Sequence, residues 1–256
     1  GEIKTIDELG YDENGNKIED DYYTTADVIG PNDEGISKLI NDYDEDNHLI
    51  SATYQNEEGK QKTMKSVGYA TAKYTYDENG KKTSEYYYDK KDNLVKSAKG
   101  YAGVVYTYDE NGNQTKEEYK DENDKNFVVE SLGYAGIEKT YDENNKLVGT
   151  KYLDASGNAI GSKDGYDNYE CEYDDNGNKT VEKYLDKSGN LVMLPAKGYA
   201  MVKHAYDEKN RETDTWYYTD KEKPALVKGI HHIVKEYDET GNVIAEKHYS
   251  KNDTLI

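Results

Sequence analysis

The chain has 256 residues, of which only 34% are hydrophobic, and its formal net charge is -20. Because this hydrophobic class includes 28 tyrosines and only one Phe and one Trp, the composition excludes a thick aliphatic core. The acidic charge argues against nucleic acid as a partner, and no apolar run reaches the length of a membrane span, so we expect no membrane insertion.

Eight Tyr-Asp dipeptides form a regular series along the chain, in steps of 32, 33, 32, 33, 32, 33 and 31 residues. This spacing predicts one continuous repeat domain over residues 1–256, made of about eight repeats of ~32 residues. Because the chain opens inside a repeat, we expect it to be a segment of a longer protein whose targeting signals lie outside it. The tyrosines of these dipeptides, called marker tyrosines below, are Tyr11, Tyr43, Tyr76, Tyr108, Tyr141, Tyr173, Tyr206 and Tyr237.

Within a repeat, two turns are predicted to separate three strands. The first turn follows the marker and reads Asp-Glu-Asn-Gly-Asn at 12–16 and 109–113. An Asn-Gly pair favours a type I′ hairpin turn, in which both central residues have positive φ. The second turn lies near 154–158 and 186–190. In the strand at 74–76, alternation places Tyr74 and Tyr76 on one face, and no helical periodicity competes with this pattern.

Two further rows of tyrosines stand at fixed sequence distances from the markers. Both rows are explained if the tyrosines of each repeat pack against those of its neighbour. A single hairpin is marginal in water, so rings from consecutive repeats are expected to stack and stabilise the array. The predicted fold is therefore all-β: a tandem β-hairpin repeat array forming an elongated solenoid, a superhelix or an extended sheet. Ten residues after the marker Asp stand the strand tyrosines, which are Tyr22, Tyr54, Tyr87, Tyr119, Tyr152, Tyr184 and Tyr217, with His248 in the last repeat. Seven residues before the marker, each after a glycine, stand the Gly-Tyr tyrosines, which are Tyr69, Tyr101, Tyr134, Tyr166 and Tyr199, with Ile36 and Ile230 replacing them twice.

The segments at 183–192 and 197–200 resemble the choline-binding or glucan-binding cell-wall repeats of Gram-positive surface proteins. Those repeats carry an aromatic-Tyr-x-Asp-x-x-Gly hairpin followed by Gly-Trp, where this chain has Gly-Tyr. The Tyr-Asp-x-x-Gly-Asn markers also resemble the YD repeats of Rhs-type proteins, which build secreted β-rich shells. Both resemblances run through nearly the whole chain, and they imply a bacterial protein that is extracellular or attached to the cell surface.

An aromatic ring that recurs in fixed phase allows two interpretations, and the sequence leaves both open. The ring can be a platform for a sugar, with many weak sites reinforcing one another, or it can pack against the next repeat. The residues predicted as ligand contacts are Tyr69, Tyr101, Tyr134, Tyr166, Tyr199 and Trp216.

No catalytic constellation, metal cluster or cofactor motif is recognised. The Asp-x-Asn-Gly-Asn turns resemble part of a calcium loop, but their glycine is at the fourth position instead of the sixth, so Ca²⁺ is left open only as a loosely bound stabiliser. We expect Cys171, in the position of Tyr74 and Tyr106, to be a packed thiol that forms no disulfide within this chain, and we expect His231 and His232 to be surface substitutions.

These observations predict a protein that is not an enzyme. The first hypothesis is a secreted repeat module that binds polysaccharide, a cell-wall glycan or another surface protein, without nucleic acid as a partner. The alternatives are a structural spacer or adhesin stalk at the bacterial surface, or the repeat region of a larger secreted protein.

Overall fold

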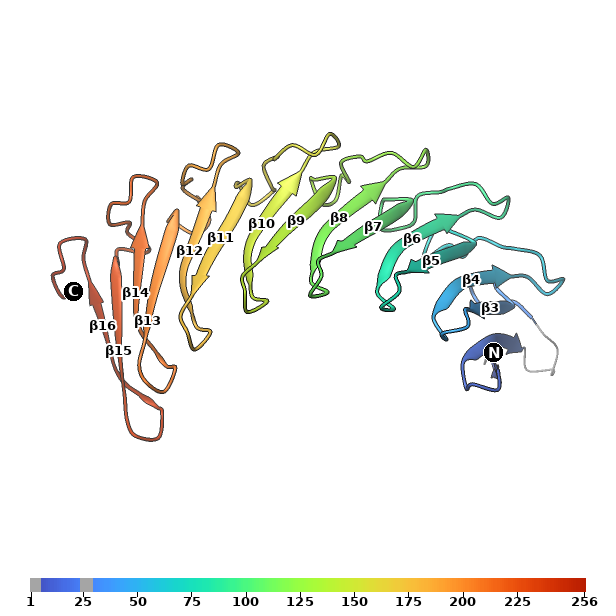
Figure 1. Cartoon of the computed structure of the whole chain (residues 1–256), viewed down its shortest axis with the longest axis horizontal. Helices are drawn as coiled ribbons and strands as arrows, with labels where there is room; N and C mark the ends of the chain where they lie inside the picture. Colours follow the sequence, from blue (N-terminus) through green and yellow to red (C-terminus); the bar gives the residue numbers. More distant parts are fainter. Residues whose placement is uncertain (1–5, 24–29) are drawn as a thin grey trace. The chain divides into compact units, whose positions relative to one another are not determined.

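The computed structural model describes residues 6–23 and 30–256, arranged in an N-terminal unit that ends at Ser131 and a C-terminal unit that begins at Leu132. In these ranges the chain forms sixteen strands and no helix, so the predicted all-β hairpin array is confirmed (Figure 1). It follows that these ranges contain no helix of the length and apolar character that crossing a membrane requires. That the two units form one continuous domain stays a prediction.

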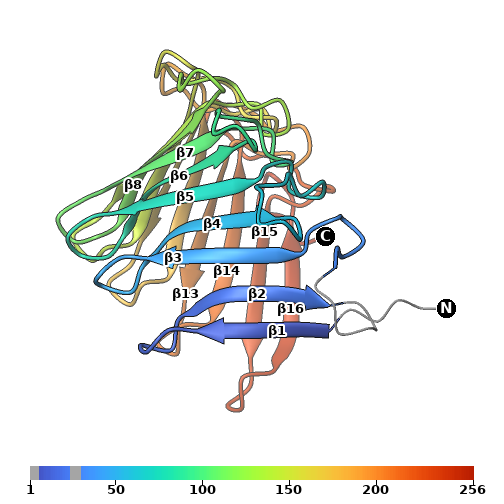
Figure 2. The same ribbon diagram turned by 90° about the vertical axis from the view of Figure 1, so that its right-hand side faces the viewer.

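The N-terminal unit is an antiparallel sheet whose strands lie side by side in chain order (Figure 2). Its strands are β1 (Ile6–Tyr11), β2 (Lys17–Tyr23), β3 (Lys38–Tyr43), β4 (Leu49–Gln55), β5 (Thr71–Tyr76), β6 (Lys82–Tyr88), β7 (Gly103–Tyr108) and β8 (Gln114–Lys120).

The C-terminal unit repeats this arrangement of consecutive hairpins. Its strands are β9 (Gly136–Tyr141), β10 (Leu147–Leu153), β11 (Asn168–Tyr173), β12 (Lys179–Leu185), β13 (Met201–Tyr206), β14 (Glu212–Tyr218), β15 (His232–Tyr237) and β16 (Val243–Tyr249).

Strand pairing is long within a hairpin and short between hairpins. In the hairpin of β5 and β6, six residue pairs run from Thr71 opposite Tyr88 to Tyr76 opposite Lys82. Between β4 and β5 only three pairs form, from Ser51 opposite Lys73 to Thr53 opposite Thr71. Backbone pairing alone therefore joins consecutive hairpins weakly, and side chains must supply the remaining cohesion.

The first turn is not the predicted type I′ turn. Of its central residues only Gly15 has positive φ (83°), and its N–H donates to the Asp12 carbonyl at 3.1 Å. The Asp12 carboxylate accepts the N–H groups of Asn14 and Asn16, at 2.9 and 2.8 Å. Tyr11 pairs with Lys17 next to a register shift. The loop is therefore a three-residue turn whose last residue, Gly15, is left-handed and forms a bulge. Glycine meets this backbone requirement without strain, and asparagine replaces it in the turns at Asn47, Asn145 and Asn210.

The predicted third strand is reduced to an isolated bridge. After the second turn, Leu94 bridges to Tyr88, and the Val95 N–H donates to the Tyr87 carbonyl at 3.0 Å. The chain then turns away, because the two edges of β6 already pair with β5 and β7. The five hairpins from β3–β4 to β11–β12 are thus each followed by a loop that folds over the sheet and carries the Gly-Tyr dipeptide.

Six of the marker tyrosines bind their own hairpin to the one before it. The Tyr108 hydroxyl donates to the carbonyl of Lys82, the first residue of β6, at 2.8 Å. The same bond, to the first residue of the second strand in the preceding hairpin, spans 2.7–3.1 Å elsewhere. The other markers that make it are Tyr43, Tyr76, Tyr173, Tyr206 and Tyr237. The marker therefore has a structural role.

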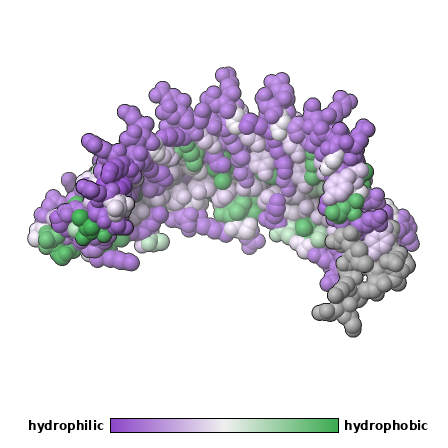
Figure 3. Space-filling model, turned by 90° about the horizontal axis from the view of Figure 1, so that it is seen from below, coloured by the Kyte–Doolittle hydropathy of each residue, from purple (hydrophilic) through white to green (hydrophobic). Residues whose placement is uncertain are grey.

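The core is thin and consists largely of small residues. Ala70, Ala72 and Ala102 are fully buried, as is Tyr87, and Val104 is 1% exposed. In the space-filling view, hydrophilic side chains project from the turns while hydrophobic atoms gather in separate patches (Figure 3). This agrees with a composition that cannot fill a thick interior.

Candidate functional site

The Gly-Tyr tyrosines of the N-terminal unit lie between the strand tyrosines of consecutive hairpins. Tyr69, in the loop after β4, has its ring centroid 6.0 Å from that of Tyr54 on β4 and 4.6 Å from that of Tyr87 on β6. Tyr101 lies in the same way between Tyr87 and Tyr119, at 6.0 and 4.9 Å. These alternating rings form a row that we call the tyrosine ladder.

The ladder has the same form in the C-terminal unit. Tyr134 lies 4.8 Å from Tyr152, and Tyr166 lies 5.7 Å from Tyr152 and 5.1 Å from Tyr184. Tyr199 lies 6.1 Å from Tyr184 and 5.2 Å from Tyr217. All five predicted Gly-Tyr residues are half-buried, so each has packed ring surface and some exposed surface, and their role in ligand binding stays a prediction.

Three of the strand tyrosines lie deeper, and the hydroxyls of two of them, Tyr87 and Tyr119, donate to a glutamate. Tyr87 is fully buried, and Tyr119 and Tyr184 are each 5% exposed. The Tyr87 hydroxyl donates to Glu85 and accepts from Lys99 Nζ at 3.0 Å. Burial and then the hydrogen bond to Glu85 raise the pKa of Tyr87 far above its ordinary value, so this phenol stays neutral.

The sixth predicted contact, Trp216, belongs to the opposite face of the sheet, because it neighbours Tyr217 on β14 and adjacent strand residues alternate. Its ring stacks on His232 at 4.7 Å. The prediction that His231 and His232 are surface substitutions is wrong. His231 is 5% exposed with its Nδ1 2.8 Å from the Tyr217 carbonyl, and Nε2 of His232 lies 2.8 Å from Asp214.

A hollow of about 740 Å³ opens on the ladder side of the C-terminal unit. Its aromatic lining comes from Tyr152, Tyr166 and Tyr184 of the ladder and from Tyr169 of β11. Thr150 contributes to the floor and Leu194 to one side. Of the predicted ligand contacts, this hollow therefore includes Tyr166 and none of the other five.

Tyr169 is the residue that departs most from the repeat pattern. It stands four residues before its marker, where the other described hairpins from β3 onward carry aliphatic residues, and it pairs with Tyr184 across the hairpin. The two rings lie 5.6 Å apart. The corresponding residues are Leu39, Ala72, Val104, Ile137, Val202 and Ile233.

Charged side chains stand at the rim of the hollow. Lys163 and Asp164 come from the loop after β10, and Lys197 comes from the loop after β12. The Lys197 ammonium lies 5.1 Å from the ring centroid of Tyr184 and 5.8 Å from that of Tyr199. The rim thus carries two cations and one anion around tyrosine hydroxyls.

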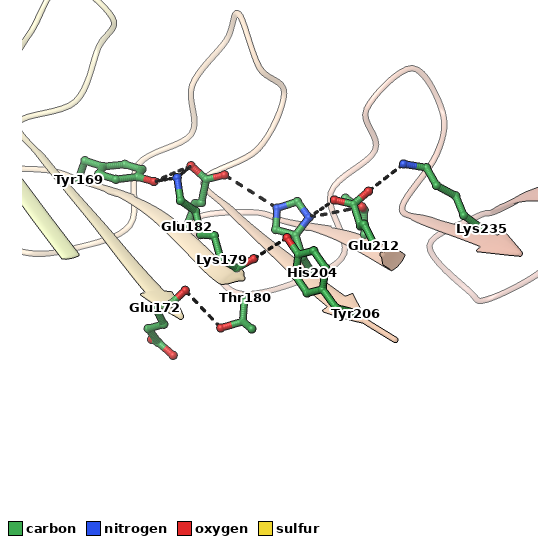
Figure 4. Close-up of polar contacts among 10 residues, drawn as sticks. Tyr169, Glu172, Lys179, Thr180, Glu182, His204, Tyr206, Glu212 and Lys235 are labelled. Atoms are coloured by element: carbon green, nitrogen blue, oxygen red, sulfur yellow. Dashed lines mark hydrogen bonds and ion pairs between the residues drawn. The ribbon is translucent and has the colours of Figure 1, made fainter. Parts of the chain in front are cut away.

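A chain of polar contacts continues from Tyr169 along the sheet (Figure 4). The Tyr169 hydroxyl donates to Glu182 Oε2 at 2.6 Å and accepts from Lys179 Nζ at 2.8 Å. Burial, followed by the bond to Glu182, raises the pKa of Tyr169 well above its ordinary range. The Glu182 carboxylate therefore fixes the position of the Tyr169 ring.

Beyond Glu182, the chain of contacts passes through His204, whose Nε2 lies 3.9 Å from Glu182 and whose Nδ1 lies 2.8 Å from Glu212. Glu212 also accepts from Lys235 Nζ at 2.8 Å. Burial alone would raise the pKa of Glu212, but the contacts with Lys235 outweigh it and hold this pKa below its usual value. The cluster is internally paired, which is typical of a structural network.

Comparison with known proteins gives a likeness of fold. No family model and no curated protein matches the chain. The chain is similar to part of the crystal structure of TcdB2-TccC3-Cdc42, with a TM-score of 0.52 and 15% identity over 99% of this chain. A weaker similarity is to the crystal structure of TcdB2-TccC3-TEV, with a TM-score of 0.40 and 14% identity over 97% of this chain and 12% of that chain. Another is to the Photorhabdus luminescens Tc holotoxin pore with the mutation TccC3-D651A, with a TM-score of 0.32 and 12% identity over 95% of this chain and 13% of that chain.

The alignment with TcdB2-TccC3-Cdc42 spans only 12% of that chain. At 15% identity it shows the fold alone. The interpretation as tyrosine-rich β-hairpin repeats is thereby strengthened, and the likeness provides no ligand and no activity for this chain.

The turn carboxylates do not gather into a metal site. In the described part of the chain no three His, Cys, Asp or Glu side chains come together in a way that could hold an ion. Asp109 illustrates the reason, since one carboxylate oxygen accepts the Asn113 N–H at 2.8 Å and the other accepts the Asn113 side chain at 3.0 Å. These bonds lower the pKa of Asp109. They also occupy both oxygens of its carboxylate within its own turn.

Cys171 is a packed thiol, as predicted. It is 5% exposed, and its Sγ lies 3.1 Å from the Leu147 carbonyl. The residues of the hollow that the sequence did not point to are Tyr169, Thr150 and the rim charges. Aligning the repeats position by position would have identified Tyr169 as an aromatic residue in an aliphatic column. No sequence signal indicates that loops from different hairpins meet around it.

Proposed function

We propose that this chain is a non-catalytic structural repeat region of a larger secreted bacterial protein. One observation carries the proposal: the side chains that recur along the array hold consecutive hairpins of each unit together. The marker hydroxyls bond to the preceding hairpin, and the ladder rings alternate between hairpins. In such an array each added repeat extends the sheet, so the number of repeats determines the length of the array and the area of its surface.

The larger protein is supported by the structural neighbour, of which a chain of this fold forms only 12%. The resemblance of the markers to repeats of secreted and surface proteins supports an extracellular location. The net charge of -20 disfavours nucleic acid as a partner.

Carbohydrate binding, the first hypothesis from the sequence, gains little from the repeated tyrosines, since each uses ring surface for packing. The role of spacer or wall accounts for all the repeats with one physical reason. Binding to a glycan is supported instead by the hollow around Tyr169, where the repeat pattern is broken.

The experiment is to raise antibodies against this chain and to blot fractions of the source cells. We expect the antibodies to detect a polypeptide much longer than these 256 residues, in the medium or the surface fraction. These fractions should lack a cytosolic marker enzyme. A product of this length that stays with the cytosolic marker would contradict the proposal.

A further inference from the structure

We propose that the hollow around Tyr169 is a single glycan-binding site that accepts neutral or anionic pyranose rings. The site goes beyond the structural role, since one place in the C-terminal unit would carry recognition while the other repeats carry length.

The walls have the chemistry that sugars require. Tyr152, Tyr166 and Tyr169 present ring surface for the C–H groups of a pyranose, and the hydroxyls of Tyr152 and Tyr166 can exchange hydrogen bonds with those of a sugar. A volume of about 740 Å³ falls in the range of small-ligand sites, ~300–1,000 Å³.

The tyrosine at position 169 is not needed for packing. In the neighbouring hairpin Val202 faces Tyr217 at the equivalent pair, and Val104 faces Tyr119. Both valines are buried, at 2% and 1% exposure, so an aliphatic residue closes this position well. The tyrosine that stands here instead of an aliphatic residue adds a fourth ring beside Tyr152, Tyr166 and Tyr184. It enlarges the aromatic surface that a ligand can contact.

The floor of the hollow is also permissive. Thr150 lies opposite Lys139, at a position where two hairpins carry a glutamate, Glu85 or Glu117, that bonds to the hydroxyl of the strand tyrosine. The shorter threonine leaves space below the rings of Tyr152 and Tyr166.

The charged side chains at the rim distinguish between cationic ligands and sugars, both of which stack on aromatic rings. A quaternary ammonium ion would also stack on tyrosines, but Lys163 and Lys197 stand at the rim against a single carboxylate, Asp164. Ammonium groups at the rim repel a cation, and that of Lys197 can also donate hydrogen bonds to sugar hydroxyls and attract a sugar carboxylate. The geometry therefore points to a neutral or acidic sugar.

The aromatic walls are held in place before a ligand arrives. Glu182 and Lys179 bind the Tyr169 hydroxyl at 2.6 and 2.8 Å, and the hydroxyls of Tyr152 and Tyr166 lie 3.4 Å apart. Such preorganisation lowers the entropic cost of binding.

The test is calorimetric titration of the full chain with maltotriose, chitotriose and tri-galacturonic acid, and with choline as a cationic probe. We expect saturable binding of at least one trisaccharide at one site per chain, and no binding of choline. Several equivalent sites per chain would instead favour the repeated Gly-Tyr tyrosines and overturn this inference.

Two variants restore the pattern of other repeats and should therefore fold. Tyr169→Val introduces the residue of the next hairpin, and Thr150→Glu fills the floor; each should weaken the trisaccharide by about tenfold or more. Lys197→Ala should also weaken it, whereas Lys99→Ala is the matched control, because Lys99 lies over Tyr87 and Tyr101 as Lys197 lies over Tyr184 and Tyr199.

Thermal unfolding of each variant shows whether the fold is kept. No saturable binding of any trisaccharide up to about 10 mM, a concentration that detects even weak sites, would overturn the inference. Binding that Tyr169→Val and Thr150→Glu leave unchanged, or binding of choline alone, would overturn it equally. Neither result would affect the proposed structural role, which depends on contacts between hairpins.

Discussion

Replacing Tyr87 with alanine is expected to destabilise the N-terminal unit by about 3–5 kcal/mol, the usual cost of removing a buried aromatic side chain. The ring is fully buried and contacts the rings of both Tyr69 and Tyr101, so its loss opens the ladder on two sides. The deletion also removes the hydroxyl that bonds to the half-buried Glu85 carboxylate. Urea unfolding followed by circular dichroism measures the effect.

Tyr11→Ala is the matched control, since this marker is 56% exposed and should change stability by no more than about 0.5 kcal/mol. If Tyr87→Ala proved no more costly than Tyr11→Ala, the ladder could not be a main source of stability.

The second large effect is alkaline unfolding. Burial raises the pKa of Tyr74 and of Tyr184 to about 12, above the ordinary value of 10.0. Because the folded state favours the neutral phenol, the stabilisation is complete below pH 10 and is lost as the pH rises towards 12. Tyr184, at 5% exposure, should contribute about 2 kcal/mol of this loss. We expect a late part of the tyrosinate absorbance, which comes from the buried tyrosines, to appear only together with the loss of the β-sheet signal.

Tyr184→Phe removes one such group and should make the stability fall less steeply across this pH interval. Ionisation of all 28 tyrosines near pH 10 while the sheet remains intact would contradict the burial of the ladder.

The order of the hairpins could be predicted from the sequence because the cause is local and repeated. The markers at 11, 43 and 76 place a turn at the same point of each repeat, and neighbouring hairpins have nowhere to pair except with one another. Stacking between the rows of strand tyrosines and Gly-Tyr tyrosines was also predictable, since both rows keep one phase. The structure adds that Tyr69 and Tyr101 reach the ladder from loops.

Two local details were wrong for physical reasons. An Asn-Gly pair fits a type I′ turn, but here the Asp12 side chain caps the backbone of Asn14 and Asn16, and this selects a turn with one left-handed residue. The third strand fails because β6 has partners on both sides, a fact of sheet assembly that no single repeat contains.

The hollow illustrates what a sequence cannot supply. Tyr169 departs from an aliphatic column and could have been noticed, but Lys163 and Lys197 belong to loops after different hairpins. Their meeting around one ring depends on how far each loop folds over the sheet. His232 was misjudged for a similar reason, because the Trp216 ring that covers it lies on another strand.

A double-mutant cycle on Tyr69 and Tyr87 tests most directly whether rings join consecutive hairpins. The two rings come from the loop after β4 and from β6, with centroids 4.6 Å apart and planes inclined by 20°. The unfolding free energies of the chain, of Tyr69→Ala, of Tyr87→Ala and of the double variant give the coupling. Rings that join the hairpins should couple by about 0.5–1.5 kcal/mol. Effects that simply add would contradict aromatic cohesion between consecutive hairpins.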